Sequence, residues 1–160
     1  MTPTPATQPT PPTPPAPPAP RSREERLKDT LARLETDVDL WVASQGHLVP
    51  LSFLWDGTTV LISTPRASRT ARNLLADGRV RLALGPTRDV VMIDGTAEPV
   101  DLADLPAGTG DAFAEKTGFD PRELTRPYQY FLIRPHRVHA WREADELDGR
   151  TLMRDGAWLS

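Results

Sequence analysis

The stretch of residues 46–64, GHLVPLSFLWDGTTVLIST, decides the fold of this chain. Gly46 suits a turn, and residues 47–55 are largely the apolar, β-branched and aromatic types that favour a strand. Asp56-Gly57 is a dipeptide typical of tight hairpin turns, and residues 58–64 supply the returning strand. The sequence therefore predicts an antiparallel hairpin within a β-rich domain.

Further strands are predicted on both sides of this hairpin. Residues 38–44 favour a strand, although Val38 and Trp41 also fit the helical period that precedes them, so a longer helix stays an alternative. The other predicted strands are residues 79–84, residues 89–100 with a bulge or bend near Asp94-Gly95, residues 128–134 and 137–143 on either side of Pro135, and a closing hairpin in residues 150–159 that turns at Asp155-Gly156.

Three helices are predicted between these strands. Ser22 and Glu25 form a capping box that begins the first helix. The second helix covers residues 69–76, and a short third helix lies around residues 111–117. Six or seven strands with short connections, and no regular alternation of strand and helix, predict a mainly β fold with some α content. We expect a small antiparallel barrel, which closes its own edges.

Proline is distributed unevenly along the 160 residues. Ten of the 18 prolines lie in residues 1–20, which carry no charged side chain and almost nothing to bury. Such a segment favours disorder with polyproline II bias, so we predict a disordered tail at residues 1–21 and one folded domain at residues 22–160. The tail is either a ligand for a proline-binding partner or a solvated extension.

Composition and missing motifs exclude several classes of protein. The chain has no cysteine and a formal charge of −3, which argues against disulfides, thiolate chemistry and general nucleic-acid binding. No apolar run is long enough for a membrane span, and no secretory signal is visible, so we expect a cytoplasmic protein. The nucleotide and zinc fingerprints are absent. His136 and His139 would point to opposite faces of a strand, so no shared metal is expected.

Residues 63–73, STPRASRTARN, run from a strand end through a turn into a helix start. The unpaired backbone N–H groups of a helix N-terminus attract anions. Ser68 and Thr70 add hydroxyl groups there, and Arg66, Arg69 and Arg72 follow at three-residue intervals. Donors and arginines in this arrangement suit a phosphate. The spacing alone leaves a solvated cationic helix face as an equal alternative.

Three linked segments, residues 46–57, 61–64 and 68–80, carry a family resemblance. They resemble the pyridoxamine 5'-phosphate oxidase-like FMN-binding split-barrel family, whose members typically show G-x-P-h-x-V-P-v, then S-x-K-x-x-N-L, then a strand that opens with R-V. The resemblance covers roughly residues 24–143 in element order. Residues 139–143 and 150–156 also resemble actinobacterial members of that family.

The resemblance implies a six-stranded split barrel that forms a homodimer, with FMN in the groove between subunits. Thr70 stands where many relatives have a phosphate-binding lysine, so Arg69 or Arg72 would have to supply that charge. The family's C-terminal strands approach the partner's cofactor, which makes Trp141 a candidate contact. The residues carried over as cofactor-binding are Val49, Pro50, Leu51 and Ser52 beside the ring, Ser63, Thr64, Arg66, Ser68, Arg69, Thr70 and Arg72 at the phosphate, and Trp141.

The resemblance also implies the activity. We expect a flavin-binding oxidoreductase that transfers hydride or electrons to an unidentified small molecule, since the cofactor carries that chemistry and the protein orients it. The alternatives are a reductase that depends on the deazaflavin coenzyme F420, and a non-catalytic flavin-binding protein. Oxidation of pyridoxamine phosphate itself is not expected, because the C-terminal Arg and His stretch of the true oxidases has no match here.

Overall fold

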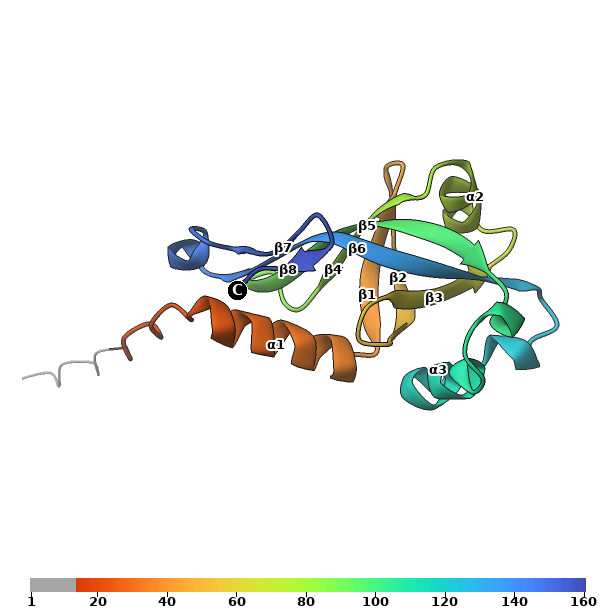
Figure 1. Ribbon diagram of the computed structural model, residues 1–160, viewed down its shortest axis with the longest axis horizontal. Coiled ribbons are helices and arrows are strands. Elements are labelled where there is room, and N and C mark those ends of the chain that lie inside the picture. Colours follow the sequence, from red (N-terminus) through yellow and green to blue (C-terminus); the bar gives the residue numbers. More distant parts are fainter. Residues whose placement is uncertain (1–13) are drawn as a thin grey trace, which may run out of the picture.

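The computed structural model describes residues 14–160, which contain eight strands and three α-helices (Figure 1). The helices are α1 (Arg23–Thr36), α2 (Arg69–Ala76) and α3 (Thr109–Thr117). The strands are β1 (Asp39–Ser44), β2 (His47–Trp55), β3 (Val60–Pro65), β4 (Arg79–Leu84), β5 (Asp89–Val100), β6 (Tyr128–Arg142), β7 (Thr151–Arg154) and β8 (Ala157–Trp158). No helix within residues 14–160 is long and apolar enough to cross a bilayer.

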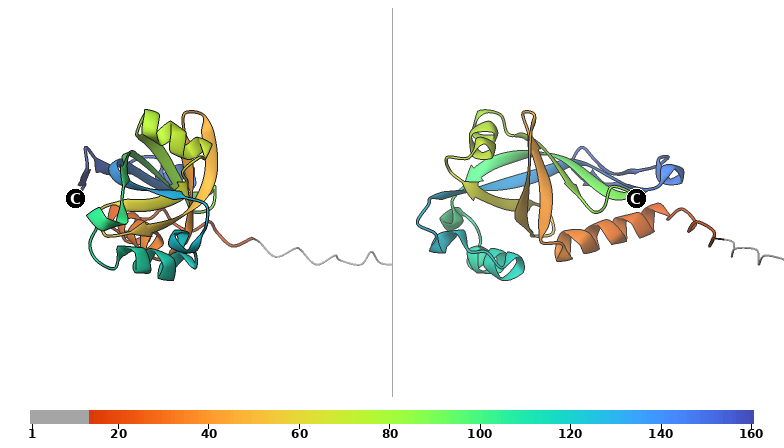
Figure 2. Two further views of the ribbon diagram at one scale, coloured as in Figure 1. Left: turned by 90° about the vertical axis from the view of Figure 1, so that its right-hand side faces the viewer. Right: turned by 180° about the vertical axis from the view of Figure 1, so that it is seen from behind.

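Six of these strands close into the predicted antiparallel barrel (Figure 2). The strand order is β3-β2-β1-β4-β5-β6, and β3 also pairs with β6, which completes the ring. The short β7–β8 hairpin extends the sheet from the far part of β6 and turns at Asp155-Gly156, as expected from the sequence. The mainly β, six-stranded barrel fold is thereby confirmed.

The central hairpin forms because its turn residues meet the geometry that the turn requires. Phe53 of β2 lies opposite Ile62 of β3, and both side chains are fully buried in the barrel interior. The Asp56 carboxylate accepts hydrogen bonds from the backbone N–H groups of Thr58 (2.8 Å) and Thr59 (2.6 Å). Gly57 has a φ of 98°, a conformation that glycine adopts at no steric cost.

Residues 39–44 form a strand, and the alternative of a longer first helix is wrong. The helix ends at Thr36, where the N–H of Asp37 bonds to the carbonyl of Arg33. Beyond that cap, Val42 pairs with Val49 of β2 on one side and with Leu82 of β4 on the other. Pairing on both edges and burial of alternate side chains stabilise the strand more than another helical turn would.

The prediction of two strands separated by Pro135 is wrong, because β6 runs without interruption from Tyr128 to Arg142. Pro135 lies opposite Gly95, at the register shift between Asp94 and Gly95 that the sequence had indicated as a bulge. A bulge tolerates a residue without a backbone N–H. A Cβ atom on Gly95 would come within 2.6 Å of the Arg134 carbonyl oxygen, so the strands approach closely only because residue 95 is glycine.

Arg21, the last residue of the predicted tail, contacts the folded domain. Arg21 donates its backbone N–H (2.7 Å) and its guanidinium (2.8 Å) to the carboxylate of Glu146, which is 2% exposed. The same guanidinium also contacts Asp29 and Asp89, so it joins α1 to the β5 start and to the turn at Ala144–Glu146. Residues 14–20 are exposed and form no helix or strand, and the prediction for residues 1–13 lies outside the described residues.

We predict that the Arg21–Glu146 pair makes the domain sensitive to acid. Hydrogen bonds from Arg21 lower the pKa of Glu146 to about 2, against an ordinary value of 4.5. The stabilisation is therefore complete above about pH 5 and is lost as the pH falls toward 2. Glu146→Gln should lower the free energy of unfolding at pH 7 by about 3 kcal/mol and should flatten its dependence on pH between 5 and 2 in urea titrations. An equally steep dependence in the variant would contradict this assignment.

Candidate functional site

A pocket opens on the outer face of the barrel where β2 and β3 separate. The ladder between these strands ends at Phe53 and Ile62, and the next residues, Ser52 and Ser63, both line the pocket. Its volume is about 350 Å³. The full lining is Asp39, Pro50, Leu51, Ser52, Ser63, Pro65, Phe119 and Tyr128.

Successive side chains of β2 point to opposite faces of the sheet, so the four predicted ring-binding residues are divided between these faces. Val49 and Leu51 pack against the barrel core, while Pro50 and Ser52 lie on the outer face that borders the pocket. Leu51 also contributes to the pocket lining. The structure therefore brings Pro50, Leu51 and Ser52 together with Ser63, and it leaves Val49 in a packing role.

A segment that the sequence did not single out covers this pocket. Phe119 follows α3, and its ring lies 5.5 Å from that of Tyr128 at an interplanar angle of 60°. The Thr117 hydroxyl donates to the backbone carbonyl of Phe113 at 2.8 Å. It also bonds to the backbone carbonyl and N–H of Phe119, on the other side of Gly118. These bonds fix the turn that carries Phe119. The pocket therefore has a preformed aromatic wall.

The cover is anchored to the rest of the domain through α3. Lys116 donates from Nζ to the carbonyl of Leu34 at the end of α1, and the same ammonium lies 3.7 Å from the ring centroid of Phe53. Burial lowers the pKa of Lys116. Beneath the helix, Phe113 meets Tyr130 edge to face, and burial raises the pKa of the Tyr130 phenol.

The start of α2 lies beside the pocket and presents free backbone donors. Ser68 is the N-cap residue, and its Oγ accepts a hydrogen bond from the N–H of Ala71 at 3.0 Å. The Oγ1 of Thr64 lies 3.0 Å from the same hydroxyl. Within residues 14–160, the backbone N–H groups of Arg69 and Thr70 bond to no protein acceptor. Two donors at a helix N-terminus are thus available to an anion.

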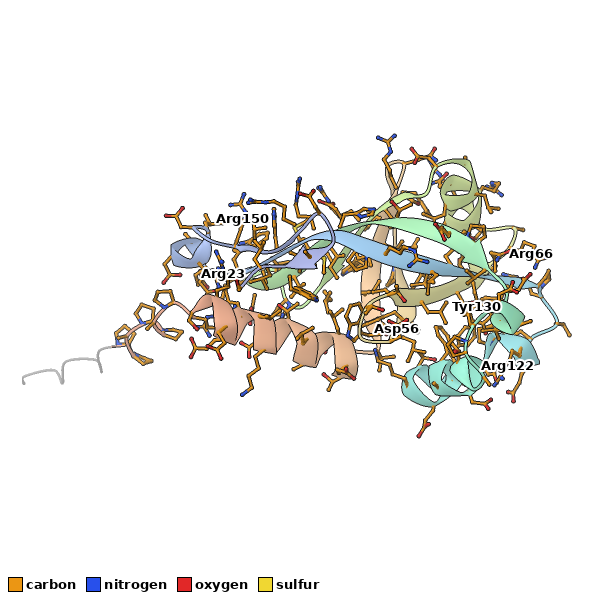
Figure 3. All side chains as sticks on the ribbon, in the orientation of Figure 1. Arg23, Asp56, Arg66, Arg122, Tyr130 and Arg150 are labelled. Atoms are coloured by element: carbon orange, nitrogen blue, oxygen red, sulfur yellow. The ribbon has the colours of Figure 1, made fainter. Side chains whose placement is uncertain are left out.

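Three arginines surround this helix start without a carboxylate partner. Arg66, Arg69 and Arg126 form no ion pair with any residue of the described chain, whereas Arg21, Arg33 and Arg122 all do. Arg126 borders a second pocket of about 250 Å³, which adjoins the first at Pro65 and is otherwise lined by Ala67, Ser68 and Pro127. Figure 3 places Arg66 at the same end of the molecule as Tyr130 and Arg122. We name Arg66, Arg69, Arg126 and the two N–H groups the arginine cradle.

Two further predicted residues have different roles in the structure. The Arg72 guanidinium donates to the carbonyl of Ala67 at 2.7 Å, so it supports the turn from behind. The side chain of Thr70 is only 2% exposed on the inner face of α2, so this residue offers its backbone N–H rather than its hydroxyl. The Thr70 side chain is therefore not placed to stand in for the lysine that many family members have at this position.

Trp141 does not lie with the other candidates. It pairs with Val90, and the Arg150 guanidinium lies 5.9 Å from its ring centroid. Tyr128, at the pocket, is at the other end of β6, roughly 40 Å away at the usual rise of a strand. Figure 3 shows Arg150 and Arg66 at opposite ends of the molecule. Trp141 could contact a ligand in this pocket only from a second copy of the chain.

Residues 41–142 match the model of the pyridoxamine 5'-phosphate oxidase family. This segment contains all six barrel strands except the first two residues of β1, and it contains the cradle, Phe119 and every residue that lines the pocket except Asp39. The chain belongs to the pyridoxamine 5'-phosphate oxidase family. The resemblance found in the sequence is confirmed. No curated protein matches the chain.

Solved structures with the same fold include proteins with different names. A protein related to general stress protein 26 from Clostridium acetobutylicum shares 18% identity with a TM-score of 0.58, covering 75% of this chain and 90% of its own. A FAD-binding protein from Mesorhizobium loti shares 18% sequence identity with a TM-score of 0.55, and the match covers 70% of this chain and 89% of that protein. An F420 reductase shares 18% sequence identity with a TM-score of 0.51, and the match covers 67% of this chain and 93% of that protein. At this identity the likeness shows the fold alone.

A further pocket of about 580 Å³ is larger than the one beside the cradle. It lies across the β1–β2 turn and the outer faces of β4 and β5. Its arginines are already neutralised, because Arg79 pairs with Asp77 (2.7 Å) and Arg81 pairs with Asp94 (2.6 Å). Its remaining titratable side chain, His136, shares a hydrogen bond of 2.7 Å with Thr96. The pocket therefore lacks the unpaired charge that distinguishes the arginine cradle.

We predict that the cap on α2 supports the cradle. Ser68→Ala removes the side-chain acceptor for the Ala71 N–H and should lower the free energy of unfolding by about 1 kcal/mol in urea titrations. Ser68→Asp retains an acceptor and should recover most of this loss. If the alanine variant is as stable as the wild type, Ser68 does not fix the start of α2.

Proposed function

We propose that this chain binds a flavin-type cofactor through the arginine cradle and acts as an oxidoreductase on a small molecule. The observation that carries the proposal is the group of uncompensated arginines at the α2 N-terminus, which opens onto a pocket with an aromatic wall. Cationic side chains and free N–H groups suit a phosphate. The adjoining pocket suits a flat ring.

The residues present fit a flavin mononucleotide in chemistry. Arg66, Arg69 and Arg126 would hold its phosphate, and Pro50, Ser52 and Ser63 would border its ring. A bound flavin supplies hydride or electron transfer, which the chain's own side chains do not. Phe119 and Tyr128 would exclude water from one side of the ring, and the hydrogen-bonded turn at Gly118 would keep Phe119 in place.

FMN is our first choice of cofactor and the deazaflavin F420 is the alternative. Related structures are named as a FAD-binding protein and an F420 reductase, which supports a cofactor of this general type. A third alternative is a flavin-binding protein without turnover.

An absorption spectrum of the purified protein, followed by titration with FMN and then F420, tests the proposal. Tight binding supports it, and no binding of either compound at micromolar concentration overturns it. Reduction of the bound cofactor by a nicotinamide donor would favour an enzyme over a carrier.

A homodimer is part of the proposal. Trp41 is 48% exposed and Leu48 is 59% exposed on the outer barrel face, where they border a groove of about 290 Å³ with Ala83 and Met92. Exposed apolar groups that gather in this way mark an interaction surface. A second copy on this face would bury them and would allow Trp141 of the partner to approach the pocket.

We predict that the cradle arginines bind the cofactor phosphate directly. Arg66→Ala, Arg69→Ala and Arg126→Ala should each weaken FMN binding by about 1.5–3 kcal/mol, the usual cost of a lost charge-assisted contact. Flavin fluorescence titration measures the affinity. Arg134→Ala is the matched control, because Arg134 is an exposed arginine of β6 outside both pockets. Unchanged affinity in all three cradle variants would place the phosphate elsewhere.

We predict that Leu48 lies in the dimer interface. Leu48→Asp would bury an unpaired carboxylate there and should yield a monomer, as measured by light scattering during size-exclusion chromatography. Leu75→Asp is the matched control, since Leu75 is 53% exposed on α2, outside that face. A dimeric Leu48→Asp variant, or a monomeric wild type, would contradict the proposed interface.

A further inference from the structure

The pocket floor is divided into a polar row and an apolar row. Asp39 of β1 pairs with Ser52 of β2, and Ser63 of β3 lines the same pocket. Two residue pairs further along, the pocket is lined by Pro50 of β2 and by Pro65 of β3, which pairs with Tyr128 of β6. Because alternate residues of a strand share a face, both rows lie on the outer face of the barrel. The pocket therefore has one hydrogen-bonding edge and one apolar edge.

The polar row is long enough to meet the edge of a fused ring system. Adjacent paired strands lie about 4.8 Å apart, so Asp39 and Ser63, two strands apart, are separated by about 10 Å or more. The arginine cradle lies beyond Pro65 on the β3 side. A ligand whose anion occupies the cradle would thus extend across β3 and β2 toward Asp39.

Asp39 lies at the end of this row, and its carboxylate has hydrogen-bond acceptor positions that no protein donor within residues 14–160 fills. The Ser52 hydroxyl donates to its Oδ1 at 2.6 Å, and Asp39 forms no ion pair with any residue in the described range. A carboxylate only accepts hydrogen bonds and has room for about four of them. Ser52 fixes its direction and leaves acceptor positions open to the pocket. The group that suits these positions is an N–H donor.

We propose that Asp39, oriented by Ser52, accepts a hydrogen bond from the ring N–H of the bound cofactor. The inference rests on the proposed function. The pyrimidine edge of a flavin or deazaflavin carries one N–H between two carbonyl groups. Ser63 forms only a long hydrogen bond of 3.5 Å to the Gln129 carbonyl, so its hydroxyl is available to a polar group of the ligand nearer the cradle.

The test compares a cofactor with its N-methylated form. The wild-type protein is titrated with FMN and with N3-methyl-FMN, or with F420 and its N3-methyl form if the earlier titration selects the deazaflavin. Loss of one hydrogen bond to a charged acceptor should weaken binding of the methylated form about tenfold or more. In Asp39→Ala, the two forms should bind within about twofold of each other, because the acceptor is gone. Ser52→Ala should give a smaller ratio than the wild type.

Asp148→Ala is the matched control, since Asp148 is an exposed aspartate outside both pockets, and it should keep the wild-type ratio. Equal binding of both forms by the wild-type protein, or an unchanged ratio in Asp39→Ala, overturns the inference while cofactor binding stands. An unchanged ratio in Ser52→Ala overturns the orienting role of Ser52. Failure of the wild type to bind either unmethylated cofactor overturns the proposed function instead. Far-ultraviolet circular dichroism of each variant establishes that it is folded.

Discussion

The pairing of β3 with β6 is the constraint on which the rest of the structure depends. It closes the barrel in register from Val60–Ile133 to Pro65–Tyr128. The same contact brings residues just before β6 to the end of β3, where the backbone N–H of Arg66 bonds to the carbonyl of Pro127. Arg126 thereby reaches the second pocket beside Ser68. Barrel closure therefore also brings Arg126 to the rest of the arginine cradle.

Charge is distributed so that one end of the candidate site is cationic and the other is anionic. Buried or half-buried arginines such as Arg21 and Arg33 are paired with carboxylates, which offsets the cost of removing them from water. The cradle arginines Arg66 and Arg69 are exposed, so solvent stabilises them without partners. They remain available to a ligand because no carboxylate within residues 14–160 forms an ion pair with them. Asp39, the acidic residue of the pocket, lies on β1, two strands away from β3 and the cradle.

Local features of the fold were predictable, and features made by distant contacts were not. The hairpin at residues 47–64 and the helix at residues 69–76 follow from turn chemistry and capping within a few residues. The inward direction of the Thr70 side chain could also have been predicted, because Thr70 lies one helical turn before the buried Leu74. The uninterrupted β6 depends on Gly95 lying opposite Pro135, which no local pattern indicates. Arg126 and Phe119 join the site only through barrel closure and the fold of α3, so no local pattern indicates them.

The wall of the pocket depends on a helix that precedes the family segment. Phe119 is held by α3, and α3 is held in turn by Lys116, whose ammonium bonds to the last turn of α1 at Leu34. Burial disfavours the charged form of Lys116 and lowers its pKa. Two contacts offset this cost, because the carbonyl at the C-terminus of α1 and the face of the Phe53 ring both attract a cation. α1 is itself fixed by Arg21 and Glu146 at its other end. The helix therefore couples the β6–β7 end of the barrel to the wall of the candidate site, and the barrel strands alone do not define that pocket.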